Sequence, residues 1–173
     1  SQEFGVRKTI SLSDVPYEIS VFDENLSGVG YKPYIALYRN DALPIDMPTG
    51  FFTNASYRGV AFNTKDDPYN NTRLRALDEP QVYRQNGGWV AFIQKYFMAS
   101  VLGSSDYDYS YFANPRSDSG LYSMGYFVEP DIESFEANNS HEHRIFIGPK
   151  TRNILANKEG VSDLELSIDM GWF

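Results

Sequence analysis

The sequence predicts a mainly β, α+β domain built on antiparallel sheet. Short runs of alternating polar and apolar residues recur along the chain, and this period of two is typical of strands with one wet face. Aromatic residues make up 16%, with 13 Tyr and 12 Phe, and flat, partly polar rings suit half-buried strands. A chain of 173 residues is long enough for one domain with a real core, so residues 1–173 are expected to form a single domain.

The N-terminal part predicts a β-hairpin. In residues 6–12 the apolar Val6, Ile10 and Leu12 are expected to point one way, and residues 16–22 repeat the alternation. Asp14 lies in the short link between the two runs. Residues 34–38 (YIALY) predict a third strand that is buried on both sides or nearly so.

Residues 40–80 lose this periodicity. Prolines at 44, 48, 68 and 80 indicate loops and short edges, and only residues 55–62 (ASYRGVAF) predict a strand there. A long irregular stretch in a compact domain is either a functional loop or an error of assignment.

The most apolar segment, residues 89–102, predicts a core helix. Trp89, Phe92, Ile93, Phe97 and Val101 share one helical face, with Gly87 and Gly88 before it and Gly103 as a stop. A helix of this length rises only about 21 Å, at about 1.5 Å per residue, so it does not span a bilayer. A buried helix is favoured over an exposed binding surface, because large apolar patches are rare on soluble monomers.

The last third of the chain predicts more strands and a second helix. Residues 107–112, 121–128 and 144–147 are strand candidates. Pro149 suits the first turn of a helix that Gly160 would cap, and residues 164–168 alternate again.

Charge and composition exclude several classes of function. The net charge is −8, with 15 Lys and Arg against 23 Asp and Glu, so phosphate backbones would repel the chain and no nucleic-acid partner is expected. The chain contains no cysteine, which excludes disulfides and thiol chemistry.

Catalytic and metal signals are weak. The two histidines, His141 and His143, would share one face if the chain were extended there, but they follow Asn138, Asn139 and Ser140, so a solvated loop is the favoured interpretation. Neighbouring carboxylates such as those at 66, 67, 106 and 108 arise easily in an acidic chain. We therefore predict no catalytic residue, no cofactor and no metal site.

Four blocks of sequence nevertheless carry a resemblance to a known family. They are GGWVAFIQKYF at 87–97, YRGVA at 57–61, FIGPK at 146–150 and DMGWF at 169–173. In this order they resemble motifs of the periplasmic domain of bacterial YidC-type membrane protein insertases.

The resemblance implies a β-supersandwich that is similar in outline to galactose mutarotases, with helices packed at its C-terminal end. It implies a non-catalytic domain on the periplasmic side of the inner membrane, with earlier strands before Ser1 and a transmembrane helix after Phe173. The implied role is to assist membrane protein insertion and folding, and the implied partners are the Sec translocon with its accessory subunits, nascent membrane proteins and the inner membrane. An alternative is a ligand- or glycan-binding module that uses its aromatic residues for stacking.

Two groups of residues are candidates for contact with other molecules. Met170, Trp172 and Phe173 form the expected junction with the membrane, where a Trp suits head-group depth. Phe51, Phe52 and Tyr69 are expected on loops that the fold itself does not require, and they form the expected partner surface.

Overall fold

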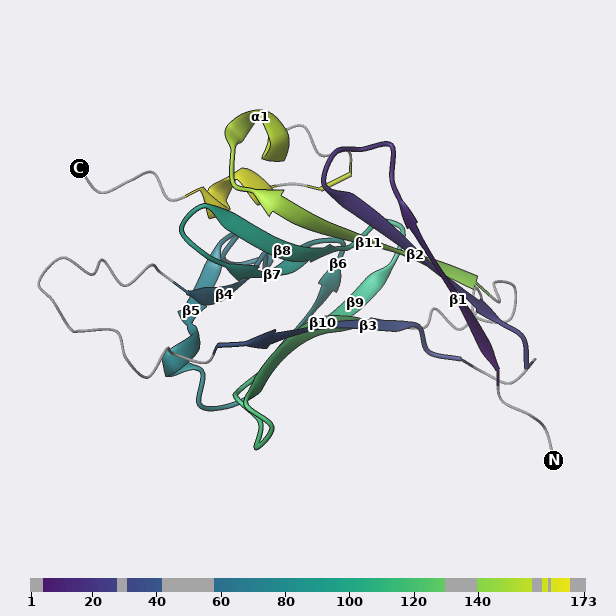
Figure 1. The fold of residues 1–173 in the computed structure, drawn as a ribbon, viewed down its shortest axis with the longest axis horizontal. Coiled ribbons are helices and arrows are strands. Elements are labelled where there is room, and N and C mark those ends of the chain that lie inside the picture. Colours follow the sequence, from purple (N-terminus) through teal and green to yellow (C-terminus); the bar gives the residue numbers. More distant parts are fainter. Residues whose placement is uncertain are drawn as a thin grey trace, which may run out of the picture.

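The protein is a β-sandwich of two antiparallel sheets (Figure 1). The computed structural model describes residues 5–27, 31–41, 58–129, 140–156, 160–161 and 163–168. Within these ranges the larger sheet has seven strands in the order β1-β2-β11-β8-β7-β4-β5, and the smaller has four in the order β3-β10-β9-β6. The predicted fold class is therefore confirmed.

The strands follow one another along the chain with few helical interruptions. They are β1 (Val6–Leu12), β2 (Glu18–Asn25), β3 (Tyr34–Asn40), β4 (Gly59–Phe62), β5 (Asn70–Arg73), β6 (Gln81–Asn86), β7 (Trp89–Ile93), β8 (Phe97–Leu102), β9 (Asp108–Asn114), β10 (Leu121–Glu129) and β11 (Ser140–Pro149). The helical elements are short: η1 (Leu74–Ala76), α1 (Arg152–Leu155) and η2 (Leu164–Ser167).

Two apolar clusters lie on opposite faces of the larger sheet. The cluster between the sheets includes Val90, Phe92 and Tyr126. The outer cluster includes Trp89 and Phe146, and Leu155 of α1 and Leu164 of η2 are packed with them. In Figure 1 the C-terminal helical elements accordingly lie over the larger sheet, on the side away from the smaller one.

The helix predicted for residues 89–102 is wrong, because this segment forms the hairpin β7–β8. The N–H of Gln94 donates to the carbonyl of Phe97 at 2.9 Å and closes the turn. Both faces of β7 are buried, so its residues are apolar on both sides. A run of this kind has the same apolar pattern as a buried helix, and periodicity alone cannot distinguish the two. Trp89 is fully buried as expected, whereas Phe97 is 56% exposed.

Three further expectations change. β3 is not buried on both sides, because Tyr34 and Tyr38 are 51% and 68% exposed. Pro149 ends β11 instead of opening a helix, and α1 is a single turn that begins at Arg152. The alternation at 164–168 belongs to a 3-10 turn, not to a strand.

The predicted N-terminal hairpin is confirmed, and β1 pairs with β2 along its whole length. Of the run predicted at 55–62, residues 58–62 are described, and β4 covers Gly59–Phe62. No helix in the described ranges is long and apolar enough to cross a membrane.

Candidate functional site

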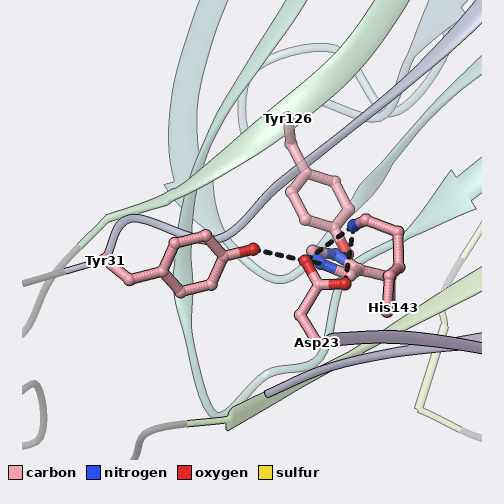
Figure 2. Close-up of polar contacts among 5 residues, drawn as sticks. Asp23, Tyr31, Tyr126 and His143 are labelled. Carbon is pink, nitrogen blue, oxygen red and sulfur yellow. Dashed lines mark hydrogen bonds and ion pairs between the residues drawn. The ribbon is translucent and has the colours of Figure 1, made fainter. Parts of the chain in front are cut away.

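A buried polar cluster joins the two sheets. Asp23 on β2 and His143 on β11 come from neighbouring strands of the larger sheet, and Tyr126 comes from β10 of the smaller one. Lys8 of β1 is the direct cross-strand partner of Asp23. Tyr31 lies in the segment that precedes β3 and contacts Asp23 from there. Figure 2 shows the side chains of Tyr31 and His143 directed toward the Asp23 carboxylate, with Tyr126 beside His143.

The hydrogen bonds of this cluster set the tautomer of His143. The Asp23 carboxylate accepts from Lys8 Nζ at 2.6 and 2.8 Å and from the Tyr31 hydroxyl. His143 Nε2 lies 3.2 Å from Asp23 Oδ2, and the Tyr126 hydroxyl lies 2.8 Å from His143 Nδ1. Because a carboxylate can only accept, Nε2 carries the proton and Nδ1 accepts from Tyr126.

The electrostatics keep Asp23 charged and His143 neutral. Burial alone would raise the pKa of Asp23, but hydrogen bonds from Lys8 and Tyr31 and the neighbouring His143 lower it below its usual value. Burial lowers the pKa of His143, and the attraction of Asp23 offsets this only in part. Burial and the hydrogen bond to Asp23 raise the pKa of Tyr31. The buried carboxylate is thus matched by one ammonium group and two neutral donors.

His141 lies beside this cluster without joining it. Its ring contacts Tyr107 and His143 edge-on, with centroids 4.9 and 4.8 Å away, and its buried Nε2 has no hydrogen-bond partner. Burial and the nearby His143 lower its pKa to about 4, although Asp23 opposes this shift. The expectation of a solvated loop is wrong, because both histidines lie on β11 with side chains directed into the sandwich.

The order of Asp23, His143 and Tyr126 resembles a proton relay, but the arrangement suits packing and not catalysis. The side chains of Asp23 and His143 are 0% exposed, as is Tyr126, so a substrate cannot reach the hydroxyl at the end of the relay. Among the described residues no group of three or more His, Cys, Asp or Glu could hold a metal ion. The cluster therefore connects β2, β10 and β11 through satisfied polar contacts.

A groove of about 370 Å³ lies between β3 and residues of β7, β8 and β11. Its lining includes β3 residues 37–40 on one side and Gln94, Phe97, Ala99 and Ile147 on the other. Phe97 and Ile147 are 56% and 49% exposed. Neither the polar cluster nor the groove was foreseen from the sequence. The sequence signal for the cluster was the alternation His141-Glu142-His143. It continues the alternation of residues 144–147 and so indicates that both histidines lie on the same strand.

The predicted contact residues fall mostly outside the described ranges. Met170, Trp172 and Phe173 lie there, as do Phe51 and Phe52. Tyr69 is half-buried and packs near Trp89, with ring centroids 6.4 Å apart. Their proposed contacts with membrane or partner remain predictions.

Comparison with known proteins identifies the family. The YidC periplasmic domain family matches residues 1–173. The chain is also 33% identical over 138 residues to a membrane protein insertase YidC from Hahella chejuensis, and the alignment covers 76% of this chain and 23% of that protein. The chain thus spans about a quarter of the length of this relative. Since the family match extends over every residue, the chain belongs to the YidC periplasmic domain family.

Proposed function

We propose that this chain is the non-catalytic periplasmic domain of an inner-membrane insertase, and that it assists the insertion and folding of membrane proteins. The observation that carries the proposal is the family match over residues 1–173. The insertase name of the Hahella relative supports it, and so does the burial of the one Asp–His–Tyr arrangement described above. In this proposal residues 1–173 form one domain, and Met170, Trp172 and Phe173 lead into a transmembrane helix.

The proposed partners are the Sec translocon with its accessory subunits and the nascent membrane proteins themselves. Phe51, Phe52 and Tyr69 are the proposed contact residues for the translocon. The alternative of a glycan-binding module has less support from the groove. Trp89 and the tyrosines at 109, 111, 122 and 126 are buried in the core. Among the described residues that line the groove, Tyr38 is the one Tyr or Trp.

The first experiment removes residues 5–168 from the full-length protein and retains the flanking chain. Insertion of a single-span membrane protein is then followed by protease accessibility in cells depleted of the native insertase. We expect slower insertion or misfolding of some substrates. Normal insertion and growth with every tested substrate would refute an assisting role.

The second experiment tests the partner surface. A photo-crosslinking residue replaces Tyr69 or Phe52 in the full-length protein, and Leu12, which is 87% exposed on the opposite edge strand β1, serves as the control. We expect translocon subunits to be captured from positions 69 and 52. Capture from position 12 alone would refute the assignment of this surface.

A further inference from the structure

We propose that the outer face of the smaller sheet binds an uncharged glycan, a flat chain of equatorially linked pyranose units, by stacking on aromatic side chains. The site is the aromatic platform formed by Tyr34 of β3, Phe127 of β10 and Phe112 of β9. None of these three is among the described residues that line the groove. The inference does not rest on the proposed function.

The alternation of the strands places the platform on the face away from the core. Each member of the platform is adjacent in sequence to a residue that is buried between the two sheets: Ile35, Tyr111 and Tyr126. Because successive side chains of a strand point to opposite faces, the platform lies on the outer face. Tyr34 is 51% exposed and Phe127 is 39% exposed, so neither ring is covered by a described element.

The rings form a continuous row across the sheet. Tyr34 and Phe127 are cross-strand partners, and their rings are stacked with centroids 5.5 Å apart and planes 29° apart. The rings of Phe127 and Phe112 are also 5.5 Å apart, at 37°. Val82, the partner of Phe112 on β6, is 58% exposed and extends the row to the last strand of this sheet. Contiguous exposed apolar surface of this kind marks interaction sites.

Small residues lie beside the row. Gly125 is the cross-strand partner of both Phe112 and Ala36, so the middle of this face has almost no side-chain volume. A Cβ at Gly125 would clash with the carbonyl oxygen of Ile35, because β3 and β10 approach closely there. The same close packing that requires the glycine therefore leaves a low surface next to the rings, on which a planar ligand can lie.

Polar groups stand at the edge of this low surface. Ser123 and Asn114 are cross-strand partners at the next outward positions of β10 and β9. Asn114 Nδ2 donates to Ser123 Oγ at 3.0 Å, and both residues are only half-buried. Because the Ser123 hydroxyl accepts this bond, its own proton is available for a ligand. A few placed polar groups beside an apolar surface are what orients a small ligand.

The charges nearest to the platform compensate one another. Lys32 Nζ lies 3.2 Å from a carboxylate oxygen of Glu129 and 5.5 Å from the centroid of the Phe127 ring. Arg84 and Asp108 lie on the same outer face, at positions two residues from Val82 and four from Phe112. Two cationic and two anionic side chains thus offset each other, although the whole chain carries −8. The face therefore suits an uncharged ligand, and the net charge of the chain repels polyanions.

The composition of the face favours a glycan over a protein partner. The cores of protein interfaces are depleted of Ser and Ala, and burial of Ser123 and Asn114 under an apolar partner would be costly without new hydrogen bonds. A second copy would also bring a second charge of −8. A pyranose has C–H groups on its faces, which suit the electron-rich faces of Tyr and Phe rings, and hydroxyl groups at its edges. It can therefore use the rings and the polar groups together.

The first test maps binding by NMR on the nitrogen-15-labelled 173-residue chain. The probes are cellohexaose and chitohexaose, which are uncharged and equatorially linked, and the matched control is maltohexaose, whose axial linkages curve the chain. We expect at least one of the two probes to cause saturable shifts at the amides of Tyr34, Gly125 and Phe127, with maltohexaose binding at least fivefold more weakly. No saturable shift with either probe, equal binding of maltohexaose, or shifts confined to groove residues such as Gln94 and Ala99 would overturn the proposal.

Three substitutions then test whether stacking is responsible. Tyr34→Ala removes a ring of the platform, Tyr34→Phe retains the ring without its hydroxyl, and Tyr96→Ala removes a ring that is 65% exposed on the turn of the larger sheet. Only Tyr34→Ala should weaken binding, by about fivefold or more, with circular dichroism confirming that the variants fold. Should Tyr34→Ala fail to fold, the shifts of the wild type still decide the site.

Two other outcomes would overturn the proposal. Equal loss of binding in Tyr34→Ala and Tyr96→Ala would mean that exposed aromatic residues bind the probe without a defined site. A dimer in sedimentation that Tyr34→Ala dissociates would assign the outer face to a second copy of this chain.

Discussion

Replacing His141 by Phe should make this domain less sensitive to mild acid. His141 is 5% exposed, its ring packs against Tyr107 and His143, and its Nε2 has no partner. Phe retains an aromatic ring at this position and cannot be protonated. The substitution therefore separates the titration of the imidazole from its packing.

The magnitude follows from the pKa. In the folded chain burial lowers the pKa of His141 from 6.5 to about 4, so the unfolded chain binds a proton more readily across this window. Stability associated with the neutral ring is fully present above about pH 6.5 and is lost as the pH falls toward 4. At about 1.36 kcal/mol per pKa unit, this residue alone should cost the wild type about 2.5 kcal/mol between about pH 7.5 and 4.5.

The assay is urea unfolding followed by circular dichroism at both pH values. The wild type should lose about 2.5 kcal/mol or more on acidification, since the lowered pKa of His143 acts in the same direction. His141→Phe should lose about 2.5 kcal/mol less and should be at least as stable at neutral pH, because a buried atom without a partner is removed. If the variant loses as much free energy of unfolding between the two pH values as the wild type does, the assignment of acid sensitivity to His141 is refuted.

Three further outcomes are expected. His143→Ala should cost about 1.5–3 kcal/mol, because it removes one of the hydrogen bonds to a fully buried carboxylate. Glu142→Ala on the exposed face of the same strand should stay within about 0.5 kcal/mol, and equal costs in urea unfolding would contradict the buried cluster. Trp89→Ala should cost about 3–5 kcal/mol of stability, because the ring is fully buried. Phe97→Ala should cost less than about 1 kcal/mol, because its ring is more than half exposed. A larger loss for Phe97→Ala than for Trp89→Ala would favour the core helix again. In the full-length protein reconstituted in bilayers, lipid-borne quenchers should quench Trp172 more strongly than the fully buried Trp89; equal quenching would exclude the proposed membrane junction.

Local pattern was sufficient for several strands and for the fold class. Residues 6–12, 121–128 and 144–147 alternate clearly because one face of each is more polar than the other, and all three lie in strands. Proline and glycine placed the breaks between such runs. Four blocks in order were also enough to indicate the family, since they depend on residue identity and not on three-dimensional contacts.

Local pattern failed where the environment of a segment is not local. β7 is apolar on both faces because one face meets the smaller sheet and the other meets the C-terminal helical elements. Its sequence therefore carries no period that distinguishes a buried strand from a buried helix. Phe97 is apolar without being buried, because it lines the groove beside β3, the outermost described strand of the smaller sheet.

The sequence by itself determined composition, charge, the recurrent period of two and the family motifs, all of which are properties of residues near one another in the chain. Only the tertiary structure decided that His143 meets Asp23, 120 residues away, and Tyr126. It also decided that the edge of β3 faces an apolar groove. The pairing of β2 with β11 produces the first result, because it joins two segments that are far apart in the chain within one sheet.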